Sequence, residues 1–315
     1  MPRVLLTNPI HPEVQVRLAQ DCELVVASDV SADTLRRLVA DADGLMVRAQ
    51  LPSDLFEHAP RLRAVVRHGV GLDMIPVAAA TERRIPVANL PGSNTQAVVE
   101  YCVAAMLHLR RGLAHMDTVL RTQGWGTSRP LAGGTGELGG GTCGIVGVGA
   151  IGSRLAAVAS GLGMRVLGLT RRPDTLPAGV EAADKQRLFA ESDVVVLCCP
   201  LTEQTRGLVD AATLARMKPT ALLVNVARGP VIDTPAELAA LREGRLGGAA
   251  LDVHDHVPLT GQEAIFDAPN LLLTPHIAGI TGTSLRAMSE AAASTMLALL
   301  RGERPANVVN PEVFR

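Results

Sequence analysis

The sequence contains few aromatic residues, few cysteines and no long apolar run. Aromatic residues make up only 2% of the 315 residues while 47% are hydrophobic, so we expect cores built from Ala, Val and Leu. No stretch approaches the roughly 18 uninterrupted apolar residues that a membrane-spanning helix requires. The first residues, MPRVLLTNPIHPEV, lack the apolar segment of a signal peptide. We therefore expect a globular chain without a membrane partner.

An excess of charge of one sign is also absent. The formal net charge is −1 and no basic run occurs, which argues against nucleic acid as a partner because phosphate binding requires clustered Lys and Arg. The five cysteines are odd in number and show no CxxC spacing, which argues against a disulfide framework or a zinc knuckle. Unpaired thiols are typical of the reducing cytoplasm, where we expect the protein.

Short apolar runs alternate with amphipathic stretches in both halves of the chain. In the first half the pattern predicts strands at residues 4–7, 22–28, 44–48, 61–70 and 86–89, with helices at 11–20, 31–42 and 77–85. In the second half it predicts strands at residues 142–149, 164–170, 194–200, 221–227, 248–253 and 270–276, and a final helix at 283–302. Such alternation is typical of an α/β fold with helices packed on a parallel sheet.

A long helical pattern lies between the two halves. Residues 95–121 carry apolar side chains at helical spacing, so we expect one helix that leaves one domain and enters another. A Gly-rich stretch, AGGTGELGGG at residues 132–141, follows this pattern, and we expect it to be loosely structured.

Residues 147–152 read GVGAIG, between the apolar strand CGIV and the helical run SRLAAVAS. A GxGxxG pattern is a weak signal alone and a strong one between a strand and a helix. Gly147 permits a tight turn, Gly149 lets the backbone approach a pyrophosphate, and Gly152 lets the helix pack on the strand. The backbone N–H groups of Ala150 and Ile151, at the start of the helix, are suited to bind phosphate. The pattern predicts a dinucleotide site, with a structural glycine turn as the alternative.

The end of the next predicted strand indicates which dinucleotide binds. NAD-binding proteins carry an acidic residue about 20 positions after the glycines, where it accepts hydrogen bonds from the ribose hydroxyls. Here that position is Thr170, followed by Arg171 and Arg172. No carboxylate repels a 2′-phosphate, and two guanidinium groups can pair with one. We therefore predict NADP over NAD, with a solvated basic turn as the alternative.

Several stretches resemble the D-isomer-specific 2-hydroxyacid dehydrogenase family, which includes glyoxylate/hydroxypyruvate reductases and phosphoglycerate dehydrogenases. The matching stretches, in chain order, are VRHGVGLDMI, PGSNTQAVVE, GVGAIG, CCPLTEQTRGLV, VNVARGPVID, GAALDV and TPHIAG. The resemblance implies two doubly wound parallel-sheet domains and a homodimer. A flavodoxin-like substrate domain would comprise residues 1–96 and 283–315, and a Rossmann cofactor domain, residues 97–282, would be inserted into it.

The implied reaction moves hydride between NADP(H) and a small 2-oxo or 2-hydroxy acid, and it requires a cation and an acid. Arg228 follows a predicted strand, and its planar guanidinium can bind a carboxylate and a carbonyl oxygen together. His276 follows another, and imidazole titrates in the range suited to an acid or base. The family resemblance favours these catalytic roles over a structural histidine.

Further site residues follow from the resemblance alone. Val70 and Gly71 match the loop whose backbone N–H groups bind the substrate carboxylate. Arg48 is a candidate for the substrate cleft, with an interdomain salt bridge as an equal alternative. Asp252 matches the aspartate that touches the nicotinamide carboxamide. The other positions that match cofactor contacts are Cys199, Thr205, Ala227 and Gly279.

One residue of the family pattern is missing. A glutamate in an LDVxxxEP segment orients the catalytic histidine in the family, by the logic of a buried aspartate in hydrolase triads. Here the segment reads LDVHDHVPL and places Val257 at that position, so we expect the pKa of His276 to be lower than in relatives. Three outcomes are open: Asp255 or His256 takes over the role, water or substrate replaces the carboxylate, or ordinary activity is lost.

The same residues also allow functions other than that of a reductase. In an extended strand Asp252, His254 and His256 would share a face and could bind a metal, but hydride transfer requires none and we expect none. The alternative enzyme is one like phosphoglycerate dehydrogenase. The alternative outside catalysis is a dinucleotide-sensing binding protein, which resembles the family's corepressor branch and keeps the same residues.

Overall fold

The computed structural model describes residues 1–315, which form two compact units. Unit 1 comprises Met1–Asn94 and Ile280–Arg315, and unit 2 comprises Thr95–Gly279. Unit 1 has a five-stranded sheet in the order β2-β1-β3-β4-β5, and unit 2 has a seven-stranded sheet in the order β12-β11-β10-β9-β6-β7-β8. All strand pairs in both sheets are parallel, which confirms the predicted fold class of two parallel-sheet α/β domains.

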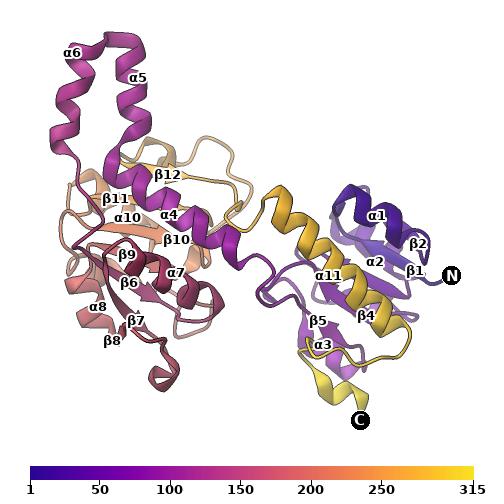
Figure 1. Cartoon of the computed structure of the whole chain (residues 1–315). Coiled ribbons are helices and arrows are strands. Elements are labelled where there is room, and N and C mark those ends of the chain that lie inside the picture. Colours follow the sequence, from indigo (N-terminus) through magenta and orange to yellow (C-terminus); the bar gives the residue numbers. More distant parts are fainter. The chain divides into compact units, whose positions relative to one another are not determined.

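Unit 1 packs helices on both faces of its sheet. Its strands are β1 (Arg3–Leu6), β2 (Glu23–Val26), β3 (Gly44–Val47), β4 (Ala64–Arg67) and β5 (Val87–Ala88). Its helices are α1 (Pro12–Leu18), α2 (Ala32–Val39), α3 (Val77–Glu82), α11 (Gly282–Leu300) and the 3₁₀ segments η1 (Leu55–His58) and η6 (Pro311–Phe314). Helices α1 and α11 cover one face, and α2, α3 and η1 cover the other (Figure 1).

The C-terminal segment returns to the edge of this sheet. Val308 forms an antiparallel bridge with Ala88 of β5. The buried side chain of Asn310 accepts a hydrogen bond from the Val87 N–H (2.8 Å) and donates to the carbonyl of Ile85 (2.9 Å). These bonds satisfy backbone groups at the short edge strand, so the last residues complete unit 1.

Unit 2 is a doubly wound sheet. Its strands are β6 (Thr142–Val146), β7 (Arg165–Leu169), β8 (Val180–Ala182), β9 (Val194–Leu197), β10 (Leu222–Asn225), β11 (Gly248–Leu251) and β12 (Leu271–Leu273). Helices α4 (Thr95–Arg111) and α7 (Ala150–Gly161) cover one face, and α8 (Lys185–Glu191), α9 (Ala211–Leu214) and α10 (Thr234–Arg242) cover the other. The short 3₁₀ segments η3 (Pro173–Thr175), η4 (Gly229–Val231) and η5 (Ala264–Asp267) lie in its loops.

The helix predicted over residues 95–121 is wrong in one respect, because two helices occupy the region. Gly112 has φ of 58° and ends α4, and α5 (Leu113–Gln123) begins directly after it. Only glycine adopts this left-handed conformation at no steric cost, so the break is encoded locally. Helix α5, α6 (Trp125–Ser128) and η2 (Arg129–Gly134) pack on one another and project from unit 2 as an arm (Figure 1).

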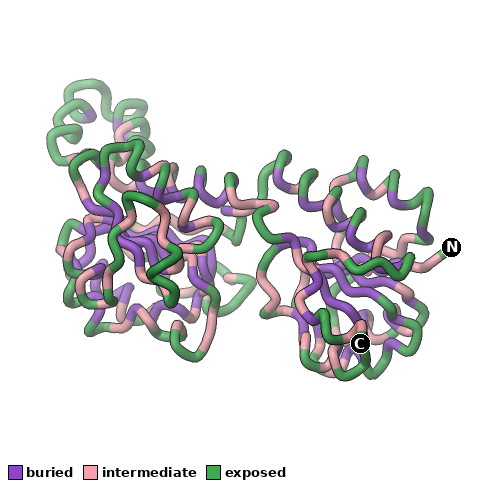
Figure 2. Tube along the Cα trace, turned by 60° about the horizontal axis from the view of Figure 1, so that its bottom comes forward, coloured by how far each residue is buried: buried purple, intermediate pink, exposed green.

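Aliphatic side chains fill both cores, as the composition predicts. Buried residues concentrate along the strands of each sheet (Figure 2). Phe56 and Phe189 are the only aromatic residues among the largest fully buried side chains, and the remainder are mostly leucines. No helix combines the length and apolarity needed to cross a membrane.

Candidate functional site

The carboxyl ends of five strands in unit 2 bring most of the predicted site residues to one edge of the sheet. These strands are consecutive in the parallel sheet, in the order β12-β11-β10-β9-β6. Their carboxyl ends therefore lie along one edge of the sheet. The loops that follow these strands carry, in chain order, Gly147, Cys199, Arg228, Asp252 and His276. Ligands of doubly wound sheets bind outside this edge.

The GVGAIG segment forms the turn from β6 into α7, with Gly149 as the N-cap. Gly147 has φ of 94°, and a Cβ there would lie 2.7 Å from the backbone of Cys199. A Cβ on Gly152 would overlap the carbonyl oxygen of Gly147, whereas one on Gly149 would meet nothing within 4 Å. Two of the glycines therefore serve close packing. The third leaves open space at a helix N-terminus, where a pyrophosphate fits.

The loop after β9 closes against this turn. The Cys198 thiol donates to the Gly147 carbonyl over 3.1 Å, and Cys199 beside it is buried. The Thr205 hydroxyl donates to the Pro200 carbonyl (2.7 Å) and accepts from the Thr202 N–H (2.7 Å). Thr205 therefore braces its own loop, and its predicted contact with the cofactor stays a prediction.

The residues after β7 leave two cations exposed. The Thr170 hydroxyl accepts a hydrogen bond from the Arg172 N–H over 3.3 Å. Arg171 and Arg172 are both exposed, and neither forms an ion pair within the chain. No neighbouring carboxylate neutralises these guanidinium groups, so both can receive an anion.

Arg228 lies in a tight turn after β10 that a buried asparagine holds. The Asn225 side chain accepts from the Ala227 N–H (3.0 Å) and donates to the Arg228 carbonyl (3.0 Å). The Arg228 backbone is extended, and its guanidinium donates to the carbonyl of Ala227 over 2.6 Å. A Cβ on the next residue, Gly229, would overlap the backbone of His254, so this turn packs directly on the segment after β11.

His276 lies in the loop after β12 with its backbone in the left-handed region, φ 58°. The buried carboxylate of Asp252 accepts hydrogen bonds from the Thr274 hydroxyl (2.7 Å), the Ile277 N–H (2.7 Å) and the Ala278 N–H (2.8 Å). A non-glycine residue in this conformation costs of order 1 kcal/mol or more and persists only where its surroundings fix it. Asp252 therefore fixes the loop on both sides of His276.

Two further side chains hold the same loop at Thr274. His254 Nε2 lies 2.9 Å from the Thr274 carbonyl, and the Tyr101 hydroxyl lies 2.7 Å from the Thr274 hydroxyl. Because the Thr274 hydroxyl hydrogen is given to Asp252, Tyr101 must be the donor of its bond. Burial raises the pKa of Tyr101 to about 12, which keeps that hydrogen in place. The sequence reasoning assigned no role to Tyr101 or His254.

The ionisable residues of LDVHDHVPL go to separate partners. Strand β11 ends at Leu251, so the alternation of a strand does not extend over Asp252, His254 and His256. Asp255 accepts from the Thr234 hydroxyl (2.6 Å), and His256 lies 3.5 Å from Glu263. The Val257 side chain is 73% exposed. No group of three or more His, Cys, Asp or Glu residues in the chain is arranged to hold a metal ion.

Unit 1 carries the other predicted loop, Val70–Gly71. Arg67, at the end of β4, donates to the carbonyls of Gly71 (3.0 Å), Val47 (2.9 Å) and His68 (2.8 Å) and so clamps both ends of the loop. The sequence reasoning missed Arg67, since its partners are backbone carbonyls that no motif reveals. Arg48 donates to the carbonyl of Pro9 within the same unit, and burial lowers its pKa.

His68 anchors the start of this loop in the core of unit 1. Its Nε2 lies 2.9 Å from the Ser289 hydroxyl of α11. That hydroxyl donates to the Leu285 carbonyl (2.7 Å) and accepts from the His11 N–H (3.0 Å), so His68 Nε2 must carry the hydrogen. Burial, with the nearby cation of Arg48, lowers the pKa of His68 to about 4 and keeps the ring neutral.

Comparison with known proteins identifies the family of this chain. Residues 103–278 match the model of the NAD binding domain of the D-isomer specific 2-hydroxyacid dehydrogenases. Glyoxylate reductase from Pyrococcus furiosus is 36% identical, over 100% of this chain and 97% of that protein. The chain therefore belongs to the D-isomer specific 2-hydroxyacid dehydrogenase family, which confirms the resemblance in the sequence. It is an oxidoreductase of this class, with a dinucleotide-binding domain of the Rossmann type.

Solved structures agree with this assignment. The TT0316 protein from Thermus thermophilus superposes with a TM-score of 0.89 at 34% identity, over 98% of this chain and 99% of that one. An NADPH-dependent glyoxylate/hydroxypyruvate reductase from Sinorhizobium meliloti, in complex with NADP and malonate, superposes with a TM-score of 0.88. Its identity is 29%, over 100% of this chain and 98% of that one.

The neutral state of His68 predicts a dependence of stability on pH. The unfolded chain takes up a proton at His68 near the ordinary pKa of about 6.5, whereas the folded chain does so only near 4. The free energy of unfolding should therefore fall as the pH decreases between these values, by up to about 3 kcal/mol. Denaturant unfolding of unit 1 at a series of pH values measures this slope.

His68→Gln removes the titration and keeps a hydrogen-bond donor for Ser289, so its slope over this pH range should be shallower. His58→Gln changes a partly exposed histidine of the same unit and serves as the control. Equal slopes in His68→Gln and the unmodified chain would contradict the assignment.

Proposed function

We propose that this protein reduces a small 2-oxo acid, such as glyoxylate or hydroxypyruvate, with NADPH. The observation that carries the proposal is the placement of Arg228 and His276 on loops at the sheet edge that also bears the GVGAIG turn. The names of the Pyrococcus and Sinorhizobium relatives support glyoxylate and hydroxypyruvate as the substrate class.

Arg228 and His276 divide the chemistry between them. The Arg228 guanidinium binds the substrate carboxylate and carbonyl oxygen and polarises the carbonyl. NADPH, when bound, supplies the hydride that reduces the carbonyl carbon. His276 in its protonated form donates a proton to the carbonyl oxygen as negative charge develops there. The product therefore carries a hydroxyl group at that carbon instead of an alkoxide. Asp252 positions His276 by holding the loop on which it lies.

Unit 2 is the proposed cofactor domain, and its residues fit a dinucleotide. The Gly147–Gly152 turn and the N–H groups of Ala150 and Ile151 receive the pyrophosphate. Arg171 and Arg172 receive the 2′-phosphate of NADP. The positions proposed to contact the nicotinamide half are on loops of the same sheet edge: Cys199, Thr205, Ala227, Asp252 and Gly279.

Unit 1 is the proposed substrate domain. The backbone N–H groups of Val70 and Gly71 bind the substrate carboxylate, and Arg48 contributes a positive charge near that loop. Arg67 fixes the conformation of the loop through the three carbonyl groups to which it donates hydrogen bonds. A loop fixed in this way gives up little conformational entropy when the substrate binds.

A panel of 2-oxo acids tests the reaction. NADPH should be oxidised on addition of glyoxylate or hydroxypyruvate, more slowly with pyruvate, and least with bulky 2-oxo acids. His276→Ala should lower kcat by about 10²–10⁴-fold, the usual contribution of a general acid. Binding of NADPH without turnover of any 2-oxo acid would refute the proposed reductase activity and favour a dinucleotide-sensing binding protein.

The same assay tests the cofactor. The kcat/KM for NADPH should exceed that for NADH, and Arg172→Ser should lower the value for NADPH while leaving that for NADH unchanged. Arg216→Ser removes an equal charge from an exposed position after α9 and serves as the control. A preference for NADH in the unmodified enzyme would contradict the role of Arg171 and Arg172.

We also propose that Val257 replaces the glutamate that orients the histidine in the family. The structure holds Asp255 against Thr234 and His256 near Glu263, so each of these two candidates has another partner. Asp252 and His254 instead fix the His276 loop through Thr274 and the backbone. The contacts of Asp255 and His256 argue against the first of the three outcomes, in which one of them takes over the role of the glutamate.

Val257→Glu should raise kcat/KM and extend the reductase activity to higher pH, because a carboxylate stabilises the protonated form of His276. The exposed position of Val257 allows the substitution without burying a charge. Val257→Gln adds a side chain of the same size without charge and should leave the pH profile of kcat/KM unchanged. Identical profiles for all three proteins would refute the placement of Val257 at this position.

The protein is further proposed to be a cytoplasmic homodimer. All five cysteines are free thiols, which suits a reducing compartment. The arm formed by α5, α6 and η2 exposes Leu113, Leu120 and Trp125, and apolar residues that gather on a projecting element are typical of subunit contacts.

Light scattering should give twice the mass of one chain, and Trp125→Glu should shift the protein toward the monomer. A monomer in the unmodified protein would contradict the proposal.

A further inference from the structure

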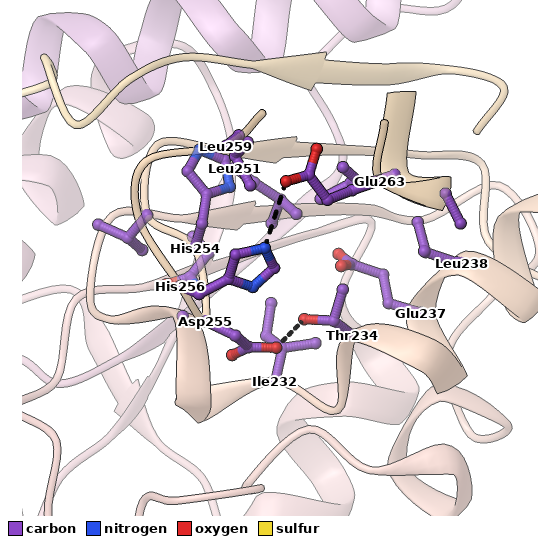
Figure 3. A pocket seen from close by; sticks show the side chains of 15 residues that line it. Ile232, Thr234, Glu237, Leu238, Leu251, His254, Asp255, His256, Leu259 and Glu263 are labelled. Carbon is purple, nitrogen blue, oxygen red and sulfur yellow. Dashed lines mark hydrogen bonds and ion pairs between the residues drawn. The ribbon is translucent and has the colours of Figure 1, made fainter. Parts of the chain in front are cut away.

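A cavity lies in unit 2 beneath the segment that follows β11. Its volume is about 120 Å³, and it is bounded by α10, the end of β11 and η5 (Figure 3). It has no part in the proposed reaction, because neither Arg228 nor His276 lines it.

Glu237 is the most unusual group in this cavity. Its side chain comes from α10, is fully buried, and directs its carboxyl group into the cavity (Figure 3). Neither carboxyl oxygen has a hydrogen-bond partner. Burial, with the nearby Asp255 carboxylate, raises the pKa of Glu237 to about 8. A buried carboxyl without a partner is costly, so a group from outside the chain is needed to satisfy it.

His254 presents a second group without a partner. Its Nε2 must donate to the Thr274 carbonyl, since a carbonyl oxygen only accepts. In the neutral ring Nδ1 is then an acceptor, and this atom is buried without a hydrogen-bond partner. Both orphaned side chains of the cavity can therefore accept a hydrogen bond.

The ionisable side chains of the cavity add further acceptors. The carboxylates of Asp255 and Glu263 also line the cavity, and no Lys or Arg does. The Thr234 hydroxyl gives its hydrogen to Asp255, and His256 faces Glu263 (Figure 3). An anion is excluded by these carboxylates. A metal ion held by three or more of these side chains is also disfavoured, because no such group is arranged for it.

The rest of the lining is aliphatic. The apolar residues are Ile232, Leu238, Leu251, Val253, Leu259 and Ile265. A cavity of about 150 Å³ in another protein accommodates benzene, so this one has room for about four or five non-hydrogen atoms. The occupant should combine a group that only donates hydrogen bonds with a short apolar chain.

We propose that this cavity binds a small primary ammonium cation, of the size of propylammonium or butylammonium. The ammonium group has three N–H donors and no acceptor, which matches the unpartnered carboxyl group of Glu237. The alkyl chain packs on Leu238, Leu251 and Ile265. Binding ionises Glu237 and forms a buried ion pair that satisfies its carboxyl group.

Direct titration with butylammonium chloride tests the site, with binding followed by calorimetry and by the shift in Tm. We expect saturable binding and a rise in Tm that the same concentration of sodium chloride does not produce. Glu237→Gln keeps the size of the side chain and removes its charge, so binding should weaken by at least about tenfold. Glu243→Gln, at the exposed end of α10, should bind as the unmodified protein does.

The pH dependence provides an independent readout. Below the pKa of Glu237 the cation must displace a proton, so the affinity should rise with pH by up to about tenfold per unit and level off above about 8. The titratable groups that line the cavity together with Glu237 are Asp255, Glu263, His254 and His256. In Glu237→Gln the rise with pH between about 7 and 8 should disappear.

Three results would overturn the proposal. Equal stabilisation by 1-butanol would show an apolar cavity without a cation site. Tighter binding of K⁺ or Mg²⁺ than of butylammonium would show a metal site. Absence of butylammonium binding at about pH 9, where Glu237 is ionised, would show that no cation site exists. None of these results bears on the reductase activity, so they leave the proposed function to its own tests.

Discussion

The arrangement of the loop that carries His276 depends on one buried carboxylate. Asp252 follows β11 and accepts three hydrogen bonds from the loop after β12, two of them from the backbone directly beyond His276. A buried carboxylate is tolerated only when its hydrogen-bonding capacity is used, and a left-handed histidine backbone only when its neighbours fix it. Here the loop supplies the hydrogen bonds that the carboxylate needs, and the carboxylate fixes the residues next to His276. The backbone position of His276 thus depends on the end of the neighbouring strand.

The sequence was sufficient for the features that local pattern encodes. Parallel sheets, the strand–glycine–helix turn at Gly147 and the position of Arg228 each follow from residues that adjoin one another in the chain. The bonds of Asp252 span 22 to 26 positions, and no periodicity reveals them. Strand β8, VEA, was missed because three residues are too few to form a pattern, and the break at Gly112 was missed because the apolar spacing continues across it. Glu237 on α10 reads as a surface charge in TPAELAALR, and only the packing shows it buried.

The segment LDVHDHVPL contacts three regions of unit 2: the loop of His276, helix α10 and the residues before η5. Asp252 and His254 hold the loop of His276, while Asp255 and His256 face α10 and the region before η5. His254 adjoins both the loop of His276 and the cavity of Glu237, because its Nε2 lies 2.9 Å from the Thr274 carbonyl and the residue lines the cavity. The cluster of ionisable residues is therefore a structural junction, and its members act on different neighbours.

Gly229 limits how this junction can evolve. Any side chain there would collide with the backbone of His254, so a larger residue requires the segment after β11 to move away from the Arg228 turn. Substitutions that reshape one loop must be matched in the other, and such pairs are expected to co-vary among relatives. Freedom to diverge lies farther along, from Val257 onward, where the chain is exposed and far enough from Gly229 to change in length. Residue 257 can thus change while the bonds of Asp252 and His254 to the loop of His276 stay intact.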